Sequence, residues 1–292
     1  MCYKMRMKSR IKTSCLCGYI GRKRILGVIL LLLVSFSSGK ADGQPVLTSR
    51  SEGKSFMISF DDGPARSSTP YILGQLRGIL NSAGYPVRVG FFLIGKDKSK
   101  SRIFDIWSCE KKIRLPFTSR FRDDICPDPG IEENPDIVRA IELDGHYVLV
   151  HGQHHADLSR LARDEVESEV LGCYEELMKA GARPLKFFRP PYLSNPAIPS
   201  DSILVREGWK IVSGVPSGDG SPFADEESVT KSCRRSIERA GTYPVLLIFH
   251  DFRGLPGHRF DFRKIIGTLT SSAYELLDFN PETMGRRLGS LP

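Results

Sequence analysis

The chain has no acidic residue among its first 41 positions, and beyond them it has almost no net charge. Nine of its 42 Lys and Arg residues lie in residues 1–41, which leaves 33 basic against 34 acidic side chains in the remainder. The formal net charge of +8 therefore belongs to the N-terminal segment. Without a positive excess in the rest of the chain, we expect no nucleic-acid partner.

An apolar run of membrane-spanning length is also lacking. The run at residues 25–34 follows a basic segment and precedes small residues around Gly39-Lys40-Ala41. Because a membrane-crossing helix needs about 20 apolar residues, this pattern is typical of a signal peptide. We expect residues 1–41 to be an export signal or, since the basic segment is long, an uncleaved anchor that would be the only membrane contact. Residues 42–54 then form a linker, and the protein is expected to be exported to the periplasm, the cell envelope or the medium.

Cysteine is scarce after the leader, and none of the four has the short spacing of a zinc site. Cys109 and Cys126 lie in one polar connection, and we favour a disulfide between them in an exported protein. Cys173 and Cys233 fall on the apolar faces of predicted helices. They are either a second pair or two buried free thiols.

From residue 55 onward, short apolar runs alternate with longer segments of helical periodicity. This alternation predicts parallel strands covered by helices, in either a barrel or an open sheet. Strands are expected at 56–60, 87–94, 146–150, 185–188, 210–215, 244–250 and 273–278. Helices are expected at 68–82, 135–144, 161–180, 199–207, 225–240 and 261–270. The predicted domain is 55–280, with a polar insertion at 95–134 that is either functional or decorative and a tail at 281–292.

Two adjacent carboxylates end the first of these apolar runs. Asp61 and Asp62 follow a buried strand and are stopped by Gly63-Pro64. Two acids side by side repel each other, and a bound cation is the usual compensation, with one acid as ligand and the other free for proton transfer.

Four of the six histidines lie within ten residues. His146 precedes a predicted strand, and His151, His154 and His155 follow it. A helical turn after this strand would bring His151 and His155 to one side, four residues apart, to share a metal, while His154 is a rival at three-residue spacing. Together with Asp62, two imidazoles suit a hydrolytic zinc site and also match non-haem iron oxygenases. A free neighbouring acid, which hydrolysis needs as a base, favours the first.

These segments, with two further motifs at Phe188-Arg189-Pro190-Pro191-Tyr192 and Val245–Asp251, resemble the polysaccharide deacetylase family, which shares the NodB-homology domain. The motifs occur in the family's order, and the match spans roughly residues 55–280 outside the insertion. The resemblance implies an α/β fold, a distorted (β/α) barrel of about seven strands. It also implies a divalent metal, most commonly Zn²⁺ with Co²⁺ or Ni²⁺ as alternatives, held by Asp62, His151 and His155.

The resemblance also assigns roles to the remaining motif residues. Asp61 would be the general base and His250 the general acid, and Arg189 would orient Asp61. The Tyr192 backbone N–H would donate to the oxyanion. Pro191 and Ile248 would line the substrate pocket.

One motif departs from the family. Its counterpart here is Ser217-Gly218-Asp219-Gly220, in which glycine replaces the usual tryptophan that walls the sugar pocket. We expect Asp219 to pair with Arg189, as the resemblance implies. Trp107, Phe223 or the insertion are the candidates for the missing aromatic wall.

The function implied is hydrolysis of N-acetyl groups on an N-acetylated polysaccharide, peptidoglycan or a chitin-like polymer, by a monomer. Acetate and a free amino sugar would be the products. Alternatives within the family are hydrolysis of acetyl esters, as in acetylxylan, or of small amides. A glycan-binding protein that has lost catalysis and an iron oxygenase are alternatives from other classes.

Overall fold

The computed structural model describes residues 53–96, 130–221 and 223–288. All of these residues belong to one unit, Ser49–Pro292. The predicted leader, the Cys109–Cys126 disulfide and most of the insertion lie outside the described residues. Within the described part of the chain, none of the helices has the length and apolar character needed to cross a bilayer.

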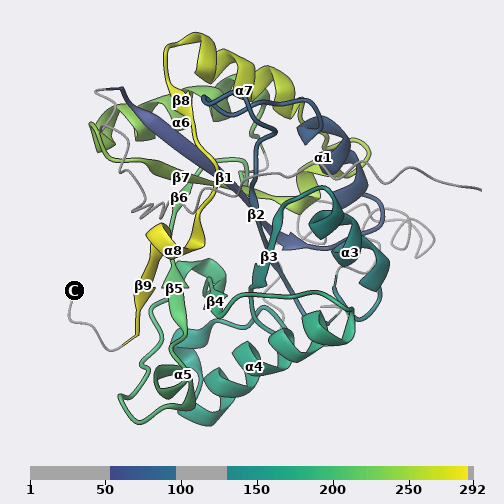
Figure 1. Cartoon of the computed structure of the whole chain (residues 1–292), viewed down its shortest axis with the longest axis vertical. Coiled ribbons are helices and arrows are strands. Elements are labelled where there is room, and N and C mark those ends of the chain that lie inside the picture. The colour runs from purple at the N-terminus through teal and green to yellow at the C-terminus, as the bar shows by residue number, and fades with distance from the viewer. Residues whose placement is uncertain (1–52, 97–129, 222, 289–292) are drawn as a thin grey trace, which may run out of the picture. The chain divides into compact units, whose positions relative to one another are not determined.

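A single curved sheet forms the centre of this unit (Figure 1). Its strand order is β6-β7-β1-β2-β3-β4-β5-β9, and β8 pairs with the start of β1. Every pairing is parallel except the antiparallel pair of β5 with β9. The strands are β1 (Ser55–Gly63), β2 (Gly90–Leu93), β3 (Tyr147–Val150), β4 (Phe187–Phe188), β5 (Lys210–Val212), β6 (Val215–Pro216), β7 (Val245–His250), β8 (Glu275–Leu276) and β9 (Gly285–Arg287).

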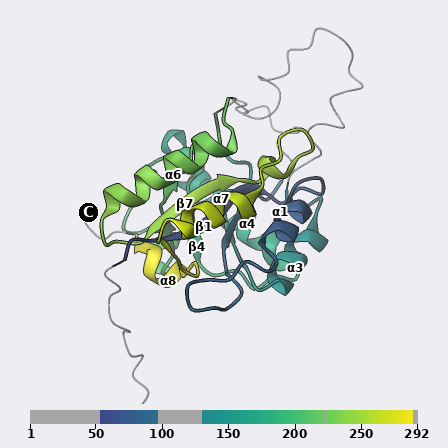
Figure 2. The same ribbon diagram turned by 90° about the horizontal axis from the view of Figure 1, so that it is seen from above.

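Helices follow most strands and lie around the outside of the sheet, from α6 and α7 at one end to α4 and α5 at the other (Figures 1 and 2). The helices are α1 (Thr69–Leu76), α3 (Pro135–Leu143), α4 (Arg163–Lys179), α5 (Ile203–Arg206), α6 (Glu226–Ala240), α7 (Phe262–Ser271) and α8 (Pro281–Met284). Three single turns, η4 (Leu158–Arg160), η5 (Pro191–Leu193) and η6 (Asp251–Gly254), follow β3, β4 and β7. The turn η6 starts directly at the end of β7, and two residues separate the start of η5 from the end of β4.

Both faces of the sheet are buried, which is the reason that its strands are almost uniformly apolar. Residues such as Ile58, Phe91 and Val148 pack outward against the helices in the larger core cluster. Their neighbours in the chain, such as Met57 and Phe92, fill the inner side of the curve in a second cluster. Alternate residues of the strands thus supply two apolar layers, as in (β/α) barrels.

The predicted fold class is confirmed: the sheet is a parallel half-barrel covered by helices. Several boundaries differ. The helix expected at 68–82 ends at Leu76, because Gly78 adopts a positive φ of 85° and the chain turns there. The strand expected at 210–215 is two strands near opposite ends of the sheet: β6 is one edge strand, and β5 lies next to the other edge strand, β9.

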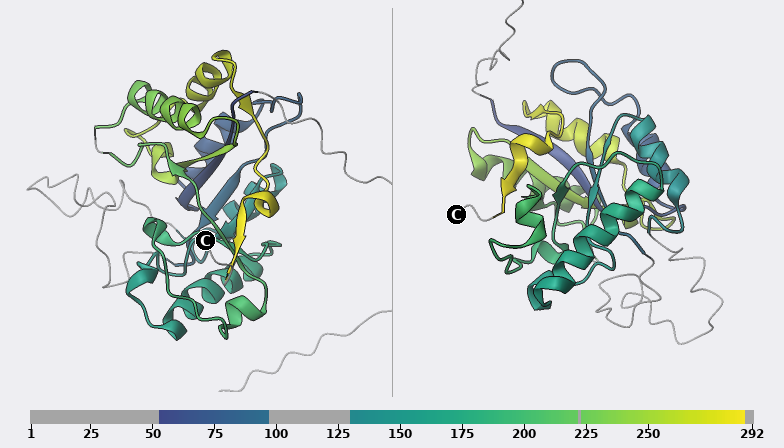
Figure 3. Two further views of the ribbon diagram at one scale, coloured as in Figure 1. Left: turned by 90° about the vertical axis from the view of Figure 1, so that its left-hand side faces the viewer. Right: turned by 60° about the horizontal axis from the view of Figure 1, so that its bottom comes forward.

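The prediction that residues 281–292 form a tail outside the domain was wrong for residues 281–287. They form α8 and β9, and β9 adds to the free edge of β5, where both run side by side in Figure 3. Of the two alternatives for Cys173 and Cys233, the structure supports buried free thiols.

Candidate functional site

The strand β1 ends in an irregularity that brings two adjacent carboxylates to one place. Asp61 is in register with His250 of β7, but the pairing with β2 shifts between Asp61 and Gly63. Asp62 adopts a positive φ of 74° at this bulge. In a regular strand, neighbouring side chains point to opposite faces. The bulge removes this alternation, and oxygens of both acids lie within 3.7 Å of Nε2 of His151.

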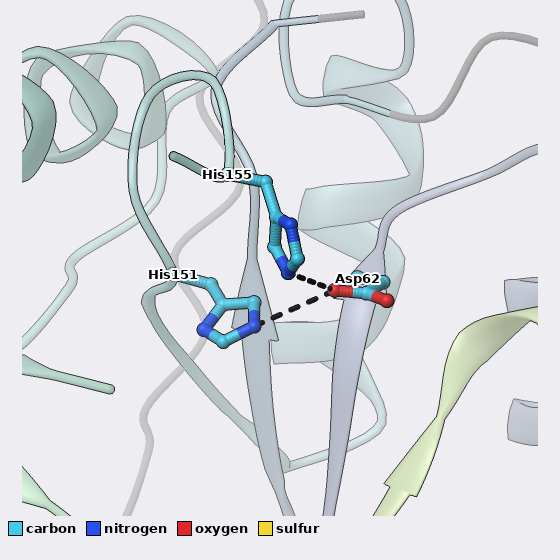
Figure 4. A group of neighbouring side chains, drawn as sticks. All are labelled: Asp62, His151 and His155. Atoms are coloured by element: carbon cyan, nitrogen blue, oxygen red, sulfur yellow. Dashed lines mark ion pairs between the residues drawn. The ribbon is translucent and has the colours of Figure 1, made fainter. Parts of the chain in front are cut away.

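The loop after β3 supplies two imidazoles to the same place (Figure 4). Nε2 of His155 lies 3.0 Å from Oδ1 of Asp62, and Nε2 of His151 lies 3.4 Å from the same oxygen. The predicted helical turn is wrong: residues 151–157 are not helical, and Gly152 and His155 have φ values of 89° and 57°. Left-handed backbone conformations, rather than helical spacing, make the two rings converge.

The orientation of the His151 ring fits a cation site. Its Nδ1 lies 2.8 Å from the carbonyl oxygen of Arg189. Since a carbonyl only accepts, Nδ1 carries a proton, and Nε2 is the ring nitrogen that faces Asp62 and is placed to act as a ligand atom. Asp62, His151 and His155 form the one group among the described residues whose ligand atoms are close enough to hold a metal, within 4.8 Å of one another.

His154, the rival ligand in the sequence analysis, turns away to another partner. Its backbone N–H donates to Glu169 Oε2 at 2.8 Å, and its Nδ1 lies 2.7 Å from Oε1 of the same carboxylate. Glu169 is buried on α4 and fixes the middle of the loop between the two ligand histidines. The sequence analysis missed Glu169, although an acid on the buried face of an amphipathic helix is a detectable signal.

Arg189 lies fully buried beside Asp61, as expected. Its Nη1 donates to Oδ1 of Asp61 at 2.5 Å and to the hydroxyl of Ser59 at 2.9 Å, and the guanidinium stacks over the ring of Phe92 at 3.8 Å. Burial lowers the pKa of Arg189, and the charge of Asp61 opposes this effect. The guanidinium therefore holds one carboxylate oxygen, while the second oxygen of Asp61 faces the candidate metal site.

The expected pairing of Asp219 with Arg189 is wrong, because Asp219 pairs with His250. Oδ2 of Asp219 accepts the backbone N–H of His250 at 2.7 Å, and Oδ1 lies 2.8 Å from its Nδ1. Burial alone would lower the pKa of His250. The charge and hydrogen bond of Asp219 outweigh it, with smaller contributions from Asp62 and Asp61, and raise this pKa to about 9. A buried carboxylate takes a partner that carries positive charge, and the guanidinium of Arg189 is already held by Asp61 and Ser59.

A second buried acid, Asp251, was also missed. It directly follows His250, and both of its oxygens accept hydroxyl groups at the start of α1, from Ser68 and, at 2.8 Å, from Thr69. An ideal Cβ on Gly63 would lie 3.0 Å from Oδ1 of Asp251. Asp251 therefore connects the end of β7 to the turn that follows Asp62.

The predicted substrate pocket is only partly formed by described residues. Pro191 and Ile248 are buried, and the exposed ring of Tyr192 lies 4.7 Å from that of His155. At Gly220 a Cβ would touch only His250 Cε1, at 3.8 Å, so the position of the missing tryptophan is open. Phe223 is 91% exposed on the same loop. Trp107 lies outside the described residues.

Comparisons with known proteins agree with this geometry. A peptidoglycan-N-acetylglucosamine deacetylase of Bacillus cereus is 26% identical over 135 residues, 46% of this chain and 35% of that protein. A bifunctional xylanase/deacetylase of Pseudobutyrivibrio xylanivorans is 21% identical over 227 residues, 77% of this chain and 30% of that protein. The matched regions thus cover about a third of the length of these curated relatives.

Solved structures share the fold. A family 4 carbohydrate esterase from Streptomyces lividans has a TM-score of 0.55 at 21% identity, covering 80% of this chain and 96% of that one. A peptidoglycan deacetylase from Bacillus subtilis has a TM-score of 0.52 at 19% identity, covering 77% and 88%. The family model described as polysaccharide deacetylase matches residues 48–200, more than half of the sequence. With this match and the shared fold, the chain belongs to the polysaccharide deacetylase family.

Proposed function

We propose that this protein is a metal-dependent hydrolase that removes N-acetyl groups from an N-acetylated glycan and releases acetate and a free amino sugar. One observation carries the proposal. A carboxylate with a free oxygen, Asp61, and an imidazole with a raised pKa, His250, are register partners on adjacent strands beside the candidate metal site. A proton acceptor and a proton donor thus lie next to the place where a carbonyl would be polarised.

Asp62, His151 and His155 would hold the cation, and we propose Zn²⁺ from the chemistry of one carboxylate and two imidazoles. When bound, such a cation acts as a Lewis acid on an acetyl carbonyl and lowers the pKa of a water in its coordination sphere. Three protein ligands leave positions for both.

The protein side chains supply the proton transfers. Oδ2 of Asp61 accepts a proton from the attacking water, while Arg189 keeps Oδ1 and the charge of the carboxylate in place. Nε2 of His250 donates a proton to the departing nitrogen, because Nδ1 is committed to Asp219. The backbone N–H of Tyr192, a residue whose ring lies against that of His155, would stabilise the developing oxyanion.

The raised pKa of His250 favours an amide substrate over an ester. An amine is a poor leaving group unless it is protonated, whereas an alcohol departs from an ester with less help. A donor that stays protonated at neutral pH suits the harder case. The B. cereus and B. subtilis relatives are peptidoglycan deacetylases, which supports N-acetylated peptidoglycan as the substrate in this proposal. The predicted export leader supports export from the cytoplasm as a further part of it.

The test is acetate release by the purified protein from N-acetylated peptidoglycan, chitooligosaccharides and acetylxylan, with and without a chelator. We expect release from an N-acetylated glycan that stops with the chelator and returns with Zn²⁺. The control is Asp61→Asn, which should bind metal and release no acetate. Release from acetylxylan alone would replace the proposal with an esterase, and binding without any turnover would replace it with a glycan-binding protein.

A further inference from the structure

Two consecutive large residues beside the candidate site have a strained backbone. Tyr192 and Leu193 have φ values of 60° and 53°, in the left-handed region that glycine adopts without steric cost. Only three other non-glycine residues in the described part of the chain share this conformation. Two of them are the ligand candidates Asp62 and His155, and the third is Ala273. The strain is therefore concentrated at the site, as expected for a functional segment.

The strained backbone does not place the side chains of Tyr192 and Leu193 in the hydrophobic core. Tyr192 is 49% exposed and Leu193 is 38% exposed, and they follow the buried Pro191. The ring of Tyr192 lies against the ring of His155, with centroids 4.7 Å apart and planes at 68°. We call these two side chains the Tyr192–Leu193 ledge. A glycine at position 193 would relieve the strain, so the leucine side chain needs another explanation.

We propose that the Tyr192–Leu193 ledge binds pyranose units of the polymeric substrate, and that Leu193 determines the preference for polymer over small acetylated substrates. This inference rests on the proposed deacetylase function. Because the ring of Tyr192 lies against that of the candidate ligand His155, a glycan whose acetamide reached the metal site would have its neighbouring sugar units beside the ledge. The C–H faces of pyranose rings are apolar, and exposed aromatic and aliphatic side chains bind such faces by excluding water.

Leu193→Gly is the sharpest test, because glycine fits the backbone conformation at this position. We expect the variant to unfold at the same temperature as the wild type or higher, and to bind Zn²⁺ with unchanged affinity. The KM for the N-acetylated polymer should rise about tenfold, from the loss of one half-exposed leucine contact. Turnover of a small acetylated substrate, 4-nitrophenyl acetate, should not change.

Two control variants separate the contact from its alternatives. Ala273→Gly relieves a similar strain, with φ of 64°, and Leu143→Ala removes a leucine that is 86% exposed on α3. Neither should change the KM for the polymer. An unchanged KM in Leu193→Gly would overturn the inference. So would an equal loss on both substrates, which would place Leu193 in the catalytic machinery.

A failure of the proposed deacetylase function can be distinguished from a failure of the ledge inference. If the wild type releases no acetate from any glycan, calorimetric binding of the intact glycan to wild type and Leu193→Gly still tests the ledge. An about tenfold weaker Kd in the variant, equivalent to about 1.4 kcal/mol, would support it, and equal Kd values would overturn it.

Discussion

Replacing Asp219 by Asn should lower the pKa of His250, so that this proton donor is no longer almost fully protonated at neutral pH. The carboxylate of Asp219 lies against both the backbone N–H and Nδ1 of His250. Burial lowers the pKa of this imidazole, and Asp219 is the main reason that it is nevertheless raised to about 9. An Asn side chain keeps the size and one acceptor but removes the charge. The remaining burial should then bring the pKa of His250 to 6.5 or below.

The size of the effect follows from this difference. A pKa raised from 6.5 to about 9 corresponds to about 3 kcal/mol in favour of the imidazolium, at about 1.4 kcal/mol per pH unit. At pH 8 a donor with a pKa of about 9 is roughly nine-tenths protonated, and one with a pKa of 6.5 is protonated to roughly 3%. Activity at pH 8 should therefore fall roughly 30-fold, and much less at pH 6. A bound dication opposes the small contributions of Asp61 and Asp62, so the loaded enzyme should titrate somewhat below 9.

Two measurements check this reasoning. The first is the pH profile of kcat for acetate release, in which the alkaline limb should move down by about two pH units in Asp219→Asn. The second is urea unfolding of the metal-free protein. Because the folded pKa of His250 lies above the unfolded one, its contribution to stability is complete below pH 6.5 and is lost as the pH rises through 9. The stability gap between wild type and variant should therefore shrink from pH 6 to pH 10. An alkaline limb that stays in place in the variant would refute the role of His250 as the acid.

Three further predictions concern buried charges. Arg189→Met should lower the free energy of unfolding in guanidinium by about 3–5 kcal/mol, because it leaves the buried Asp61 without its partner; a loss below 1 kcal/mol would contradict the pairing. Asp62→Asn should abolish Zn²⁺ binding in calorimetry while Asp61→Asn retains it, and equal losses would mean that both acids are ligands. Burial raises the pKa of Asp251 from 3.8 to about 7, so the wild type without metal should lose up to about 4 kcal/mol of stability between pH 4 and pH 7. The Asp251→Asn variant should lose much less stability between pH 4 and pH 7. If the urea midpoints of the wild type and the variant changed in parallel with pH, Asp251 would not be a buried group that becomes charged in this range.

The sequence predicts the parts of this fold that local pattern determines. Apolar runs of about five residues alternating with amphipathic helices are sufficient to specify parallel strands with helical crossovers. Because the carboxyl ends of parallel strands meet at one edge, residues that end three separate runs, Asp61, His151 and His250, could be expected to lie together. The register of β1 with β7, which places Asp61 opposite His250, bears this out.

Features that depend on long-range pairing could not be read in the same way. The strand β9 contains Gly-Arg-Arg and has no apolar alternation, and its pairing arises because β5 offers a free edge. The pairing of Asp219 with His250, rather than with Arg189, also depends on long-range contacts. It depends on which buried cation is already paired, and that is a property of the assembled site.

The ligand pair His151 and His155 shows how a correct prediction can rest on the wrong geometry. Their four-residue spacing suggested a helical turn, but the loop reaches the same convergence through left-handed conformations at Gly152 and His155. A left-handed backbone conformation is uncommon for any residue other than glycine and costs free energy, although histidine adopts it more often than most residues do. The compensation comes from Glu169 on α4, which holds the backbone N–H and the ring of His154 between the two ligands. A loop whose conformation is stabilised from a helix outside it can place metal ligands that its own sequence would not hold.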